Sequence, residues 1–455
     1  METQLDKFVL EKMSESRIPG MSIAVVKNGK LVYSRGFGFR DIQAGKPSTP
    51  MTIYGIGSIT KSFTAIGIMQ LVEKGLVSLD DPVEKFVPLK LEPFGEPVKV
   101  HHLLTHSSGI PSLGYAEAFL DGALYVDDVW LPVATPDDII TFAQDAEKWA
   151  FTSPGKRFFY SNTGYVLLGK IISKVSGMSY EEYVKENILE PLKMKRSYFF
   201  KEEVENDPDV ARGYAVDREG KHIPKDFPYG ITADGGLLSN VLDLVKYLTM
   251  YLNRGEYEGN RILEKSSIEI MENPYIQVPG QIFGNEGYGY GWVIHSNFLG
   301  ERLIEHSGSV LIYTGFVGYI PEKNIGVAVL ANSSGYPLSA IGMYALALAL
   351  GKNPEEELPF VKEEKVLKKL EGIYEGYKGT VRFSVKKDGS FLVLEMLSRL
   401  GKYSLVLVPQ KIEDNTVICF TLSNGRKIVV EFYIREDGSV EIIYERYRLL
   451  KQGAL

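Results

Sequence analysis

One stretch decides the fold: Ser58-Ile59-Thr60-Lys61, which opens a largely apolar segment that runs to Lys74. Its apolar residues recur at mostly helical spacing, and Gly75 stands where a left-handed residue often ends a helix. Side chains at positions i and i+3 share one face of a helix, so Lys61 is expected beneath the Ser58 hydroxyl. A hydroxyl and an amine placed in this way are the fewest groups that a self-activated serine nucleophile needs.

The pattern Ser-x-x-Lys also occurs at residues 153–156 and 384–387. The first of these contains Pro154-Gly155, which is typical of a turn, and the second lies in an alternating run that predicts a strand. Only Ser58 opens a predicted helix. Taken alone, Ser58 is better explained as a plain helix cap, so the other motifs of the chain have to decide between the two interpretations.

A second motif, Tyr160-Ser161-Asn162, lies on an irregular connection ahead of an apolar helix predicted over residues 164–175. Loops held by rigid elements often present catalytic groups. The alternative is an aromatic packing residue followed by an Asn that caps the helix. A similar triplet, Tyr251-Leu252-Asn253, falls inside a continuous helical pattern and has no reason to reach a cleft.

A third motif, His306-Ser307-Gly308, ends a strand-like run over residues 302–305 and is the only His-x-Gly in the sequence. Because Gly308 has no side chain, it leaves room for a substrate backbone beside the strand. Together the three motifs predict an open cleft lined by a hydroxyl, an amine, a phenol and an imidazole.

In this order the motifs resemble those of the serine β-lactamase and penicillin-binding-protein superfamily. The resemblance is to its β-lactamase-related group of D-aminopeptidases, esterases and CubicO-type serine peptidases. Three further patches agree with it, at residues 102–109, 235–239 and 288–292. The resemblance covers roughly residues 1–350, and it implies an α/β (α+β) domain with an antiparallel sheet and a helical subdomain that closes the cleft.

The resemblance implies roles for the reactive groups. Ser58 would be the acylated nucleophile, Lys61 its amine partner, and Tyr160 a group that helps to move protons. Either Lys61 or Tyr160 could be the base for acylation, because the choice depends on their coupled protonation. His306 takes the place of the lysine in the Lys-Thr-Gly version of the third motif.

The resemblance also implies the groups that hold the substrate. Asn162 would belong to the second wall of the cleft, and Gly308 would leave space for the substrate backbone. The backbone N–H groups of Ser58 and Ser309 would form the oxyanion hole. Two fixed amide dipoles aimed at the developing negative charge usually contribute more than any single proton transfer.

His306 narrows the expected substrate. A lysine there would bind the carboxylate of β-lactams or of peptides ending in D-Ala, whereas a histidine is expected to be only partly protonated near neutrality. We therefore expect a serine peptidase of aminopeptidase or endopeptidase type, which could accept D-amino-acid peptides, and poor turnover of penicillins. The alternatives are an esterase that uses the same residues, and a non-catalytic penicillin-recognising sensor or binding protein.

Composition limits the other classes of function. The 455-residue chain has 44% hydrophobic residues and a net charge of −7, without the basic block that indicates a nucleic-acid partner. Its one cysteine, Cys419, forbids an internal disulfide. His102 and His106 lie four residues apart but lack the glutamate of a zinc motif. We expect structural hydrogen bonds from these two histidines, and neither a metal nor a cofactor.

The start of the sequence suggests a location. Met1-Glu2-Thr3 opens the chain without the basic and apolar regions of a signal peptide, and no run is long enough to span a bilayer. We therefore expect a cytoplasmic protein that acts on intracellular peptides or on small esters and amides.

The sequence predicts two domains. A catalytic domain is expected over residues 1–350, followed by a Pro-bounded acidic linker over 351–363. Residues 364–455 hold about seven short strands separated by tight turns, which predicts a small up-and-down antiparallel β-barrel. Strands of the catalytic domain are predicted near 21–26, 30–33, 302–306, 314–320 and 325–331.

The second domain has two candidate roles. Its opening, Leu370-Glu371-Gly372-Ile373-Tyr374, resembles lipocalin-like domains appended to some members of the β-lactamase-related group, which suggests a ligand cavity. However, about 90 residues leave little interior once side chains fill a small barrel. We favour a structural role and hypothesise that residues 364–455 mediate homo-oligomerisation that restricts access to Ser58.

Overall fold

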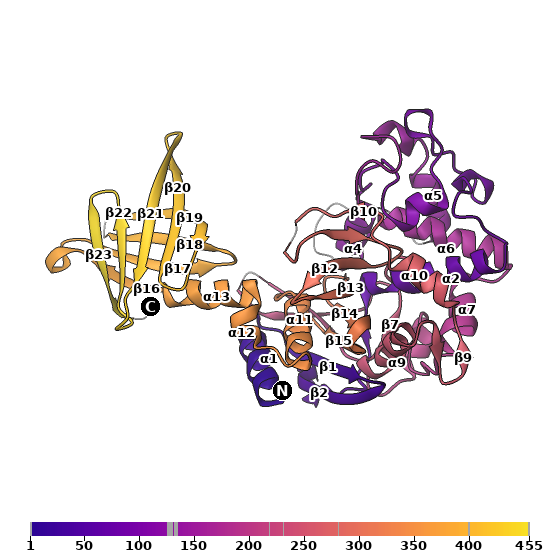
Figure 1. Ribbon diagram of the computed structural model, residues 1–455, viewed down its shortest axis with the longest axis horizontal. Helices are drawn as coiled ribbons and strands as arrows, with labels where there is room; N and C mark the ends of the chain where they lie inside the picture. The colour runs from indigo at the N-terminus through magenta and orange to yellow at the C-terminus, as the bar shows by residue number, and fades with distance from the viewer. Residues whose placement is uncertain are drawn as a thin grey trace. The chain divides into compact units, whose positions relative to one another are not determined.

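The structure is a computed structural model that describes residues 2–124, 131, 135–217, 219–230, 232–280, 282–398 and 401–453. It separates into two compact units, residues 1–352 and residues 353–455. Figure 1 labels the helices and strands of both units, which are described here one at a time.

The centre of the first unit is a nine-stranded sheet with the order β10-β11-β12-β13-β14-β15-β1-β2-β3. Neighbouring strands in it run antiparallel. The first strands of the chain therefore pair with the last strands of the unit. The strands are β1 (Gly20–Lys27), β2 (Lys30–Asp41), β3 (Lys46–Pro47), β10 (Ile276–Gln277), β11 (Glu286–Tyr288), β12 (Val293–Phe298), β13 (Glu301–Ser309), β14 (Thr314–Ile320) and β15 (Ile325–Ala331).

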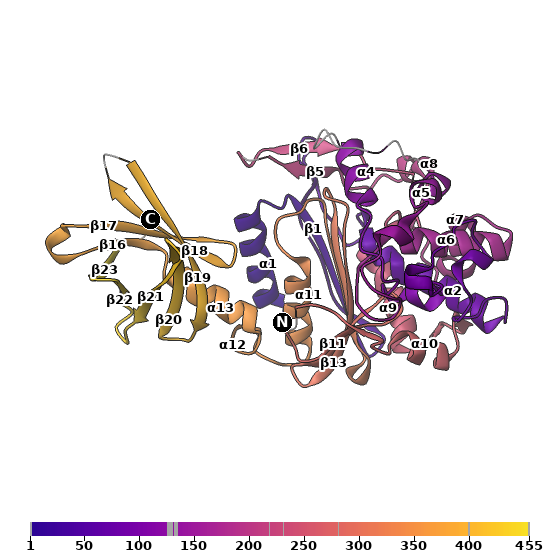
Figure 2. The ribbon, with the colours of Figure 1, turned by 90° about the horizontal axis from the view of Figure 1, so that it is seen from above.

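Helices cover both faces of this sheet. α1 (Glu2–Ser16) and α11 (Leu338–Ala349) lie on one face, and α9 (Val241–Leu252) lies on the other, beside the mainly helical region (Figure 2). The helical region contains α2 (Thr60–Glu73), α3 (Val100–Leu104), α4 (Tyr115–Leu124), α5 (Pro136–Phe142), α6 (Asn162–Ser176), α7 (Tyr180–Val184), α8 (Lys201–Glu205) and α10 (Lys265–Met271). Short pairs join β4 (Tyr54–Gly55) to β7 (Leu238–Ser239), β5 (Gly213–Val216) to β6 (His222–Lys225), and β8 (Glu256–Tyr257) to β9 (Asn260–Arg261).

The β1–β2 hairpin turns at Asn28-Gly29. Both residues have positive φ, 52° and 70°, as a two-residue turn with the twist of the flanking strands requires. β2 is much longer than the predicted strand over 30–33, because its pairing with β1 continues to Gly38. The glycines at 36 and 38 break the sequence pattern of that strand but permit close backbone contacts, since a Cβ at Gly36 would lie 2.1 Å from Ser48 O.

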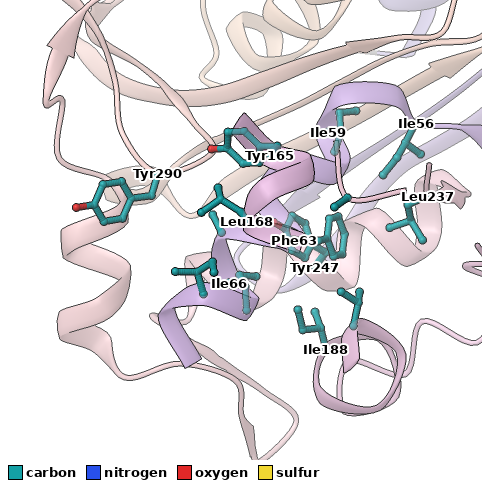
Figure 3. Packing of buried hydrophobic residues seen from close by; sticks show 14 of the residues in the cluster. Ile56, Ile59, Phe63, Ile66, Tyr165, Leu168, Ile188, Leu237, Tyr247 and Tyr290 are labelled. Atoms are coloured by element: carbon teal, nitrogen blue, oxygen red, sulfur yellow. The ribbon is translucent and has the colours of Figure 1, made fainter. Parts of the chain in front are cut away.

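α2 is buried on every side from Thr60 to Leu71. In Figure 3 its Phe63 packs against Tyr247 of α9, and the two rings stack with their centroids 4.0 Å apart. A helix that is surrounded by other elements needs no polar face. This explains why the apolar residues of the 59–74 segment show helical spacing only in part.

The second unit is a closed barrel of eight antiparallel strands, in the order β16 to β23. The sequence predicts seven, because its last predicted strand, residues 440–449, is in fact two strands. They are joined at Glu445-Arg446, where Glu445 has a φ of 51° without being Gly or Asn. The strands are β16 (Gly372–Glu375), β17 (Arg382–Asp388), β18 (Phe391–Ser398), β19 (Gly401–Ile412), β20 (Thr416–Ser423), β21 (Arg426–Ile434), β22 (Val440–Tyr444) and β23 (Tyr447–Gly453).

The segment predicted as a linker, residues 351–363, is helical. It holds α12 (Pro354–Glu357) and the first half of α13 (Pro359–Lys369). Pro354 and Pro359 each stand in the first turn of a helix, where the missing N–H costs nothing, and three glutamates favour the first turn of α12. A Pro-bounded acidic stretch therefore marks two helix starts here.

Side chains fill the interior of the barrel. Cys419 on β20 is fully buried there among aliphatic and aromatic residues such as Leu407 and Phe432. In the described ranges of the chain, no helix is both long and apolar enough to cross a membrane. The cytoplasmic location stays a prediction.

Candidate active site

Ser58 lies in a tight 3₁₀ turn, Gly57–Ile59, that leads directly into α2. It is not the cap residue of either helix, so its hydroxyl does not have the capping role considered above. Gly57 has a φ of 54°, and a Cβ there would lie 2.5 Å from the backbone nitrogen of Ser309. The turn therefore needs a glycine for two reasons, its backbone conformation and its close approach to β13.

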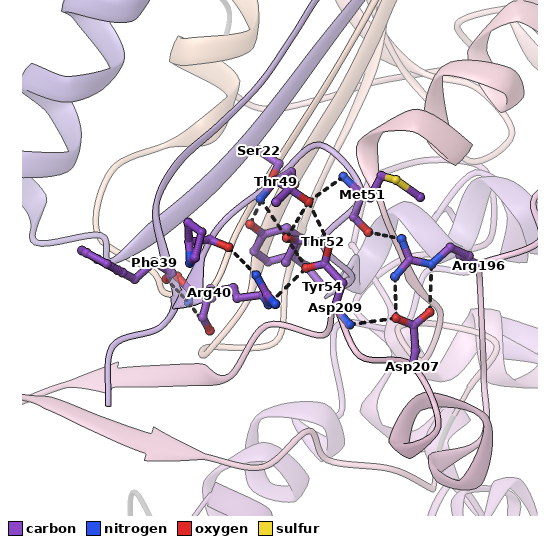
Figure 4. Close-up of polar contacts among 12 residues, drawn as sticks. Ser22, Phe39, Arg40, Thr49, Met51, Thr52, Tyr54, Arg196, Asp207 and Asp209 are labelled. Carbon is purple, nitrogen blue, oxygen red and sulfur yellow. Dashed lines mark hydrogen bonds and ion pairs between the residues drawn. The ribbon is translucent and has the colours of Figure 1, made fainter. Parts of the chain in front are cut away.

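A polar network fixes the chain that leads into this turn (Figure 4). The Asp209 carboxylate accepts hydrogen bonds from Thr49 Oγ1 at 2.8 Å and Thr52 Oγ1 at 2.7 Å. The Arg196 guanidinium forms an ion pair with Asp207 and donates to Met51 O at 2.8 Å. Side chains from the helical region thus hold residues 49–52, a few residues before Ser58.

Lys61 is fully buried and makes three polar contacts. Its Nζ lies 3.1 Å from Ser58 Oγ, 2.7 Å from Asn162 Oδ1 and 2.8 Å from the backbone oxygen of Asp234. These partners come from the turn before α2, the start of α6 and a loop far along the chain. The structure therefore brings Ser58, Lys61 and Asn162 together around one amine.

The second motif, Tyr160-Ser161-Asn162, also contacts the amine of Lys61. Ser161 is the cap of α6, because its hydroxyl accepts from Gly164 N at 3.2 Å. The alternative that Asn162 caps this helix is therefore wrong, and its side-chain oxygen is directed to Lys61 instead. The centroid of the Tyr160 ring lies 4.9 Å from Lys61 Nζ, within the range of a cation–π contact.

His106 supports this second motif. Its Nδ1 accepts a hydrogen bond from the backbone N–H of Ser161 at 3.0 Å, and its ring packs on Tyr160 with a centroid distance of 4.3 Å. Burial, together with the positive charge of Lys61, holds the pKa of His106 well below its usual value. The structural role expected for this histidine is thus specific: it positions the connection that carries Tyr160.

The third motif brings a free strand edge to Ser58. β12 pairs with β13 only as far as Glu305, so the edge of β13 beyond it is open to the 3₁₀ turn. A Cβ at Gly308 would lie 1.9 Å from Ile56 O and 3.0 Å from Ser58 N. The Val310 N–H donates to Tyr313 O across the hairpin, and successive N–H groups of a strand point to opposite edges. The N–H of Ser309 therefore points toward the turn that holds Ser58.

His306 differs from the expectation of a partly charged side chain. It is 4% exposed, its Nδ1 lies 2.6 Å from Ser307 O, and its Nε2 lies 2.9 Å from the Tyr288 hydroxyl. Burial and, next, the charge of Lys61 lower the pKa of His306 to about 3. A carbonyl oxygen only accepts, so Nδ1 carries the proton, and Tyr288 donates to Nε2. The ring is neutral at neutral pH.

A cavity opens at Ser58. Its polar lining is provided by Ser58, Tyr115, Asn162, Asp234 and Ser309, and His306 is not part of it. One wall is apolar, with contributions from α4 and the loop near residue 227: Ala116, Phe119, Leu120, Phe227, Pro228 and Val310. Sequence reasoning missed Asp234, whose only signal is its place directly before the Gly235-Gly236 patch. Within the described residues, no group of three His, Cys, Asp or Glu side chains is placed to hold a metal ion.

Each of the two units of the chain matches a known protein family. The family described as Beta-lactamase matches residues 5–352. This chain belongs to the β-lactamase family. A second family, described as the Pab87 octamerisation domain, matches residues 354–450. The superfamily predicted from the three motifs is therefore confirmed.

Individual proteins are also similar to this member of the β-lactamase family. Protein flp of Staphylococcus aureus (strain MW2) is 30% identical over 336 residues, which cover 73% of this chain and 63% of that protein. The present chain thus matches less than two thirds of the length of that relative. Penicillin-binding protein 4* of Bacillus subtilis (strain 168) is 26% identical over 95% of this chain and 96% of its own. The solved structure of the octameric penicillin-binding protein homologue from Pyrococcus abyssi has 64% identity, a TM-score of 0.94 and 99% coverage of both chains.

The state of His306 can be measured directly. A histidine pKa that is lower in the folded than in the unfolded chain gives stability that is present above about pH 6.5 and is lost as the pH falls toward about 3. We expect histidine ring NMR signals of His306, assigned through their absence in His306→Gln, to show a neutral ring throughout the range from about pH 5 to 8. A titration midpoint near 6.5 would contradict the neutral, doubly hydrogen-bonded ring.

Proposed function

We propose that the enzyme is an amidase or peptidase that forms an acyl-enzyme on Ser58. The contacts of Lys61 carry this proposal. Asn162 Oδ1 and the backbone oxygen of Asp234 can only accept hydrogen bonds, so they take two N–H groups of the amine. In the deprotonated form that the proposed reaction needs, a lysine has two N–H groups and one lone pair, and the lone pair is then left for the Ser58 hydroxyl at 3.1 Å.

The proposed reaction uses these groups in turn. Ser58 Oγ bonds to the carbonyl carbon while its proton passes to Lys61 Nζ, and the proton then goes to the leaving amine as the carbon–nitrogen bond breaks. The N–H groups of Ser58 and Ser309 are the proposed donors to the oxyanion, since both lie where the turn meets β13. Water then attacks the acyl carbon and gives a proton to Lys61, which returns it to Ser58 Oγ as the bond between Oγ and the acyl carbon breaks and the acid leaves. Tyr160 stays an alternative base, because its ring also lies against Lys61.

The cavity supports a choice of substrate. Its apolar wall from α4 suits a substrate with an apolar side chain next to the scissile carbonyl. Among the described residues, no lysine or arginine lines it, and His306 is neutral, so these residues offer a substrate carboxylate no cationic partner. This favours peptides, amides and esters over penicillins. The esterase alternative uses the same residues, and turnover of matched amide and ester substrates separates the two activities.

The identity of the nucleophile is testable by mass spectrometry. After exposure to activated esters and to L- and D-configured peptide amides, we expect a covalent adduct on Ser58, because this hydroxyl lies beside the proposed base. Ser58→Ala should show no adduct and should lose at least about a thousandfold in kcat/KM. Ser153→Ala, in a Ser-x-x-Lys sequence outside the cavity lining, is the matched control and should keep the adduct. An adduct that persists in Ser58→Ala would refute the assignment.

The substrate preference predicts poor turnover of penicillins. Nitrocefin carries a carboxylate that a cationic residue would normally bind, and the part of the cavity lining that the structure describes offers no such residue. One missing charge-assisted hydrogen bond reduces kcat/KM by roughly 10- to 100-fold. The measurement is nitrocefin hydrolysis by the pure protein, with a serine β-lactamase as positive control. Efficient hydrolysis would overturn this preference.

We also propose that residues 353–455 assemble the protein into a homo-oligomer, as an octamer. Support comes from the match of residues 354–450 to an octamerisation family and from the octameric relative that aligns over both units. The filled interior of the barrel favours a structural role over ligand binding. Its outer surface includes apolar side chains that a partner could cover, such as Val406 and Leu422, the latter 68% exposed. We further propose that assembly restricts which substrates reach Ser58.

The oligomer prediction calls for light scattering on the full chain and on a form that ends at residue 352. We expect an octamer for the full chain and a much smaller species after deletion, because the first unit has its own core. The deleted form should also accept larger peptides if assembly limits access. A full chain that is monomeric, or a shortened chain that stays octameric, would contradict the proposal.

A further inference from the structure

We propose that Asp234 forms a binding site for the ammonium group of the substrate, beside Ser58. The substrate class is then amides, peptides or esters with a free amine next to the scissile carbonyl. This inference deepens the proposed function and rests on it. It starts from a side chain that the reaction written above leaves unused, since only the backbone oxygen of Asp234 contacts Lys61.

The carboxylate of Asp234 is incompletely paired. The residue is 7% exposed, and its Oδ2 accepts a hydrogen bond from the Tyr115 hydroxyl at 2.6 Å. Its Oδ1 is buried, and no donor among the described residues forms a hydrogen bond with it. Leaving a buried charged oxygen unsatisfied is costly, so a native site of this kind is expected to have a partner in its working state.

Lys61 cannot be that partner through a hydrogen bond. An ammonium has three N–H groups, and the three contacts of Lys61 Nζ are to Ser58, Asn162 and the backbone of Asp234. If Lys61 is neutral, it has still fewer donors to offer. Burial raises the pKa of Asp234, and the charge of Lys61 only opposes this effect from a distance.

The position of Asp234 makes the substrate the natural source of the missing cation. Asp234 and Tyr115 both line the cavity that opens at Ser58. The rest of the wall near Tyr115 is apolar, so an amine that enters there has one carboxylate to bind. A carboxylate at this place also repels anionic substrates, in accord with the neutral His306.

Three types of phenylalanine-like amide test the site at about pH 7, where an α-amino group with a pKa near 7.7 to 8.0 is mostly charged. They are phenylalanine amide in both configurations, its N-acetyl form, and 3-phenylpropionamide, which lacks the amine without added bulk. We expect kcat/KM of the wild-type enzyme to favour the free amine over both analogues by roughly 10- to 100-fold, as one charge-assisted hydrogen bond supplies. An equal kcat/KM for all three would overturn the inference.

Variants test whether Asp234 causes the preference for substrates with a free amine. Asp234→Asn should bring the ratio of free-amine to des-amino turnover close to one, whereas Glu117→Gln, which removes an exposed acid of α4 outside the cavity lining, should leave the ratio high. Tyr115→Phe removes the donor to Oδ2 and should keep or increase the ratio of free-amine to des-amino turnover. If Asp234→Asn does not fold, Tyr115→Phe is the variant that tests the ammonium site. A high ratio in Asp234→Asn, or a ratio near one in Tyr115→Phe, would refute the site.

A parallel experiment separates this inference from the proposed function. The wild-type protein is treated with 4-nitrophenyl acetate, which has no amine, and Ser58 is examined for acetylation. No adduct means that the acyl-enzyme proposal itself fails, and the ammonium site fails with it. An adduct without any preference for amines refutes the ammonium site alone, and an adduct with that preference supports both.

Discussion

The amine of Lys61 is the constraint around which the first unit is arranged. A fully buried lysine is unfavourable unless its donors find partners, and these partners come from three distant segments: residue 58, residue 162 and residue 234. α2 is buried on all sides, which fixes the position of the amine. The connection before α6 and the loop before β7 must then approach closely enough to reach it. The packing of the helical region and the geometry of the candidate site therefore depend on the same contacts of Lys61.

A second constraint is the approach of two backbones. Gly57 and Gly308 have no Cβ, and a Cβ on either would collide with the backbone of the other segment. This contact sets the N–H groups of Ser58 and Ser309 beside a strand edge that β12 does not cover. The neutral ring of His306 forms hydrogen bonds with the Tyr288 hydroxyl and with a backbone oxygen. Its role in our account is to position this edge, and it offers no charge to a substrate.

Much of this could be predicted from the sequence because the chemistry is concentrated in short motifs. Ser58 and Lys61 are one helical turn apart, so local geometry alone makes them neighbours. The protonation of His306 could not be predicted in this way, because it depends on burial and on a lysine some 245 positions away, which only the fold brings near. Asp234 could not be predicted for a similar reason: its only signal in the sequence is the Gly235-Gly236 patch that follows it, and its importance comes from the cavity that it lines.

Errors in the second unit have local causes. The turn at Glu445-Arg446 lacks Gly or Asn, so the strands on its two sides were merged in the prediction. Prolines at 354 and 359 stand in helix first turns but were interpreted as the limits of a linker.

The central claim is that Lys61 activates Ser58, and the rate at which a fluorophosphonate labels Ser58 tests it most directly. Lys61→Met keeps the length of the side chain but removes the amine, with circular dichroism as the check on folding. Loss of a positioned base predicts a decrease in the labelling rate of about 100-fold or more. Labelling of a folded Lys61→Met variant at the wild-type rate would contradict the account.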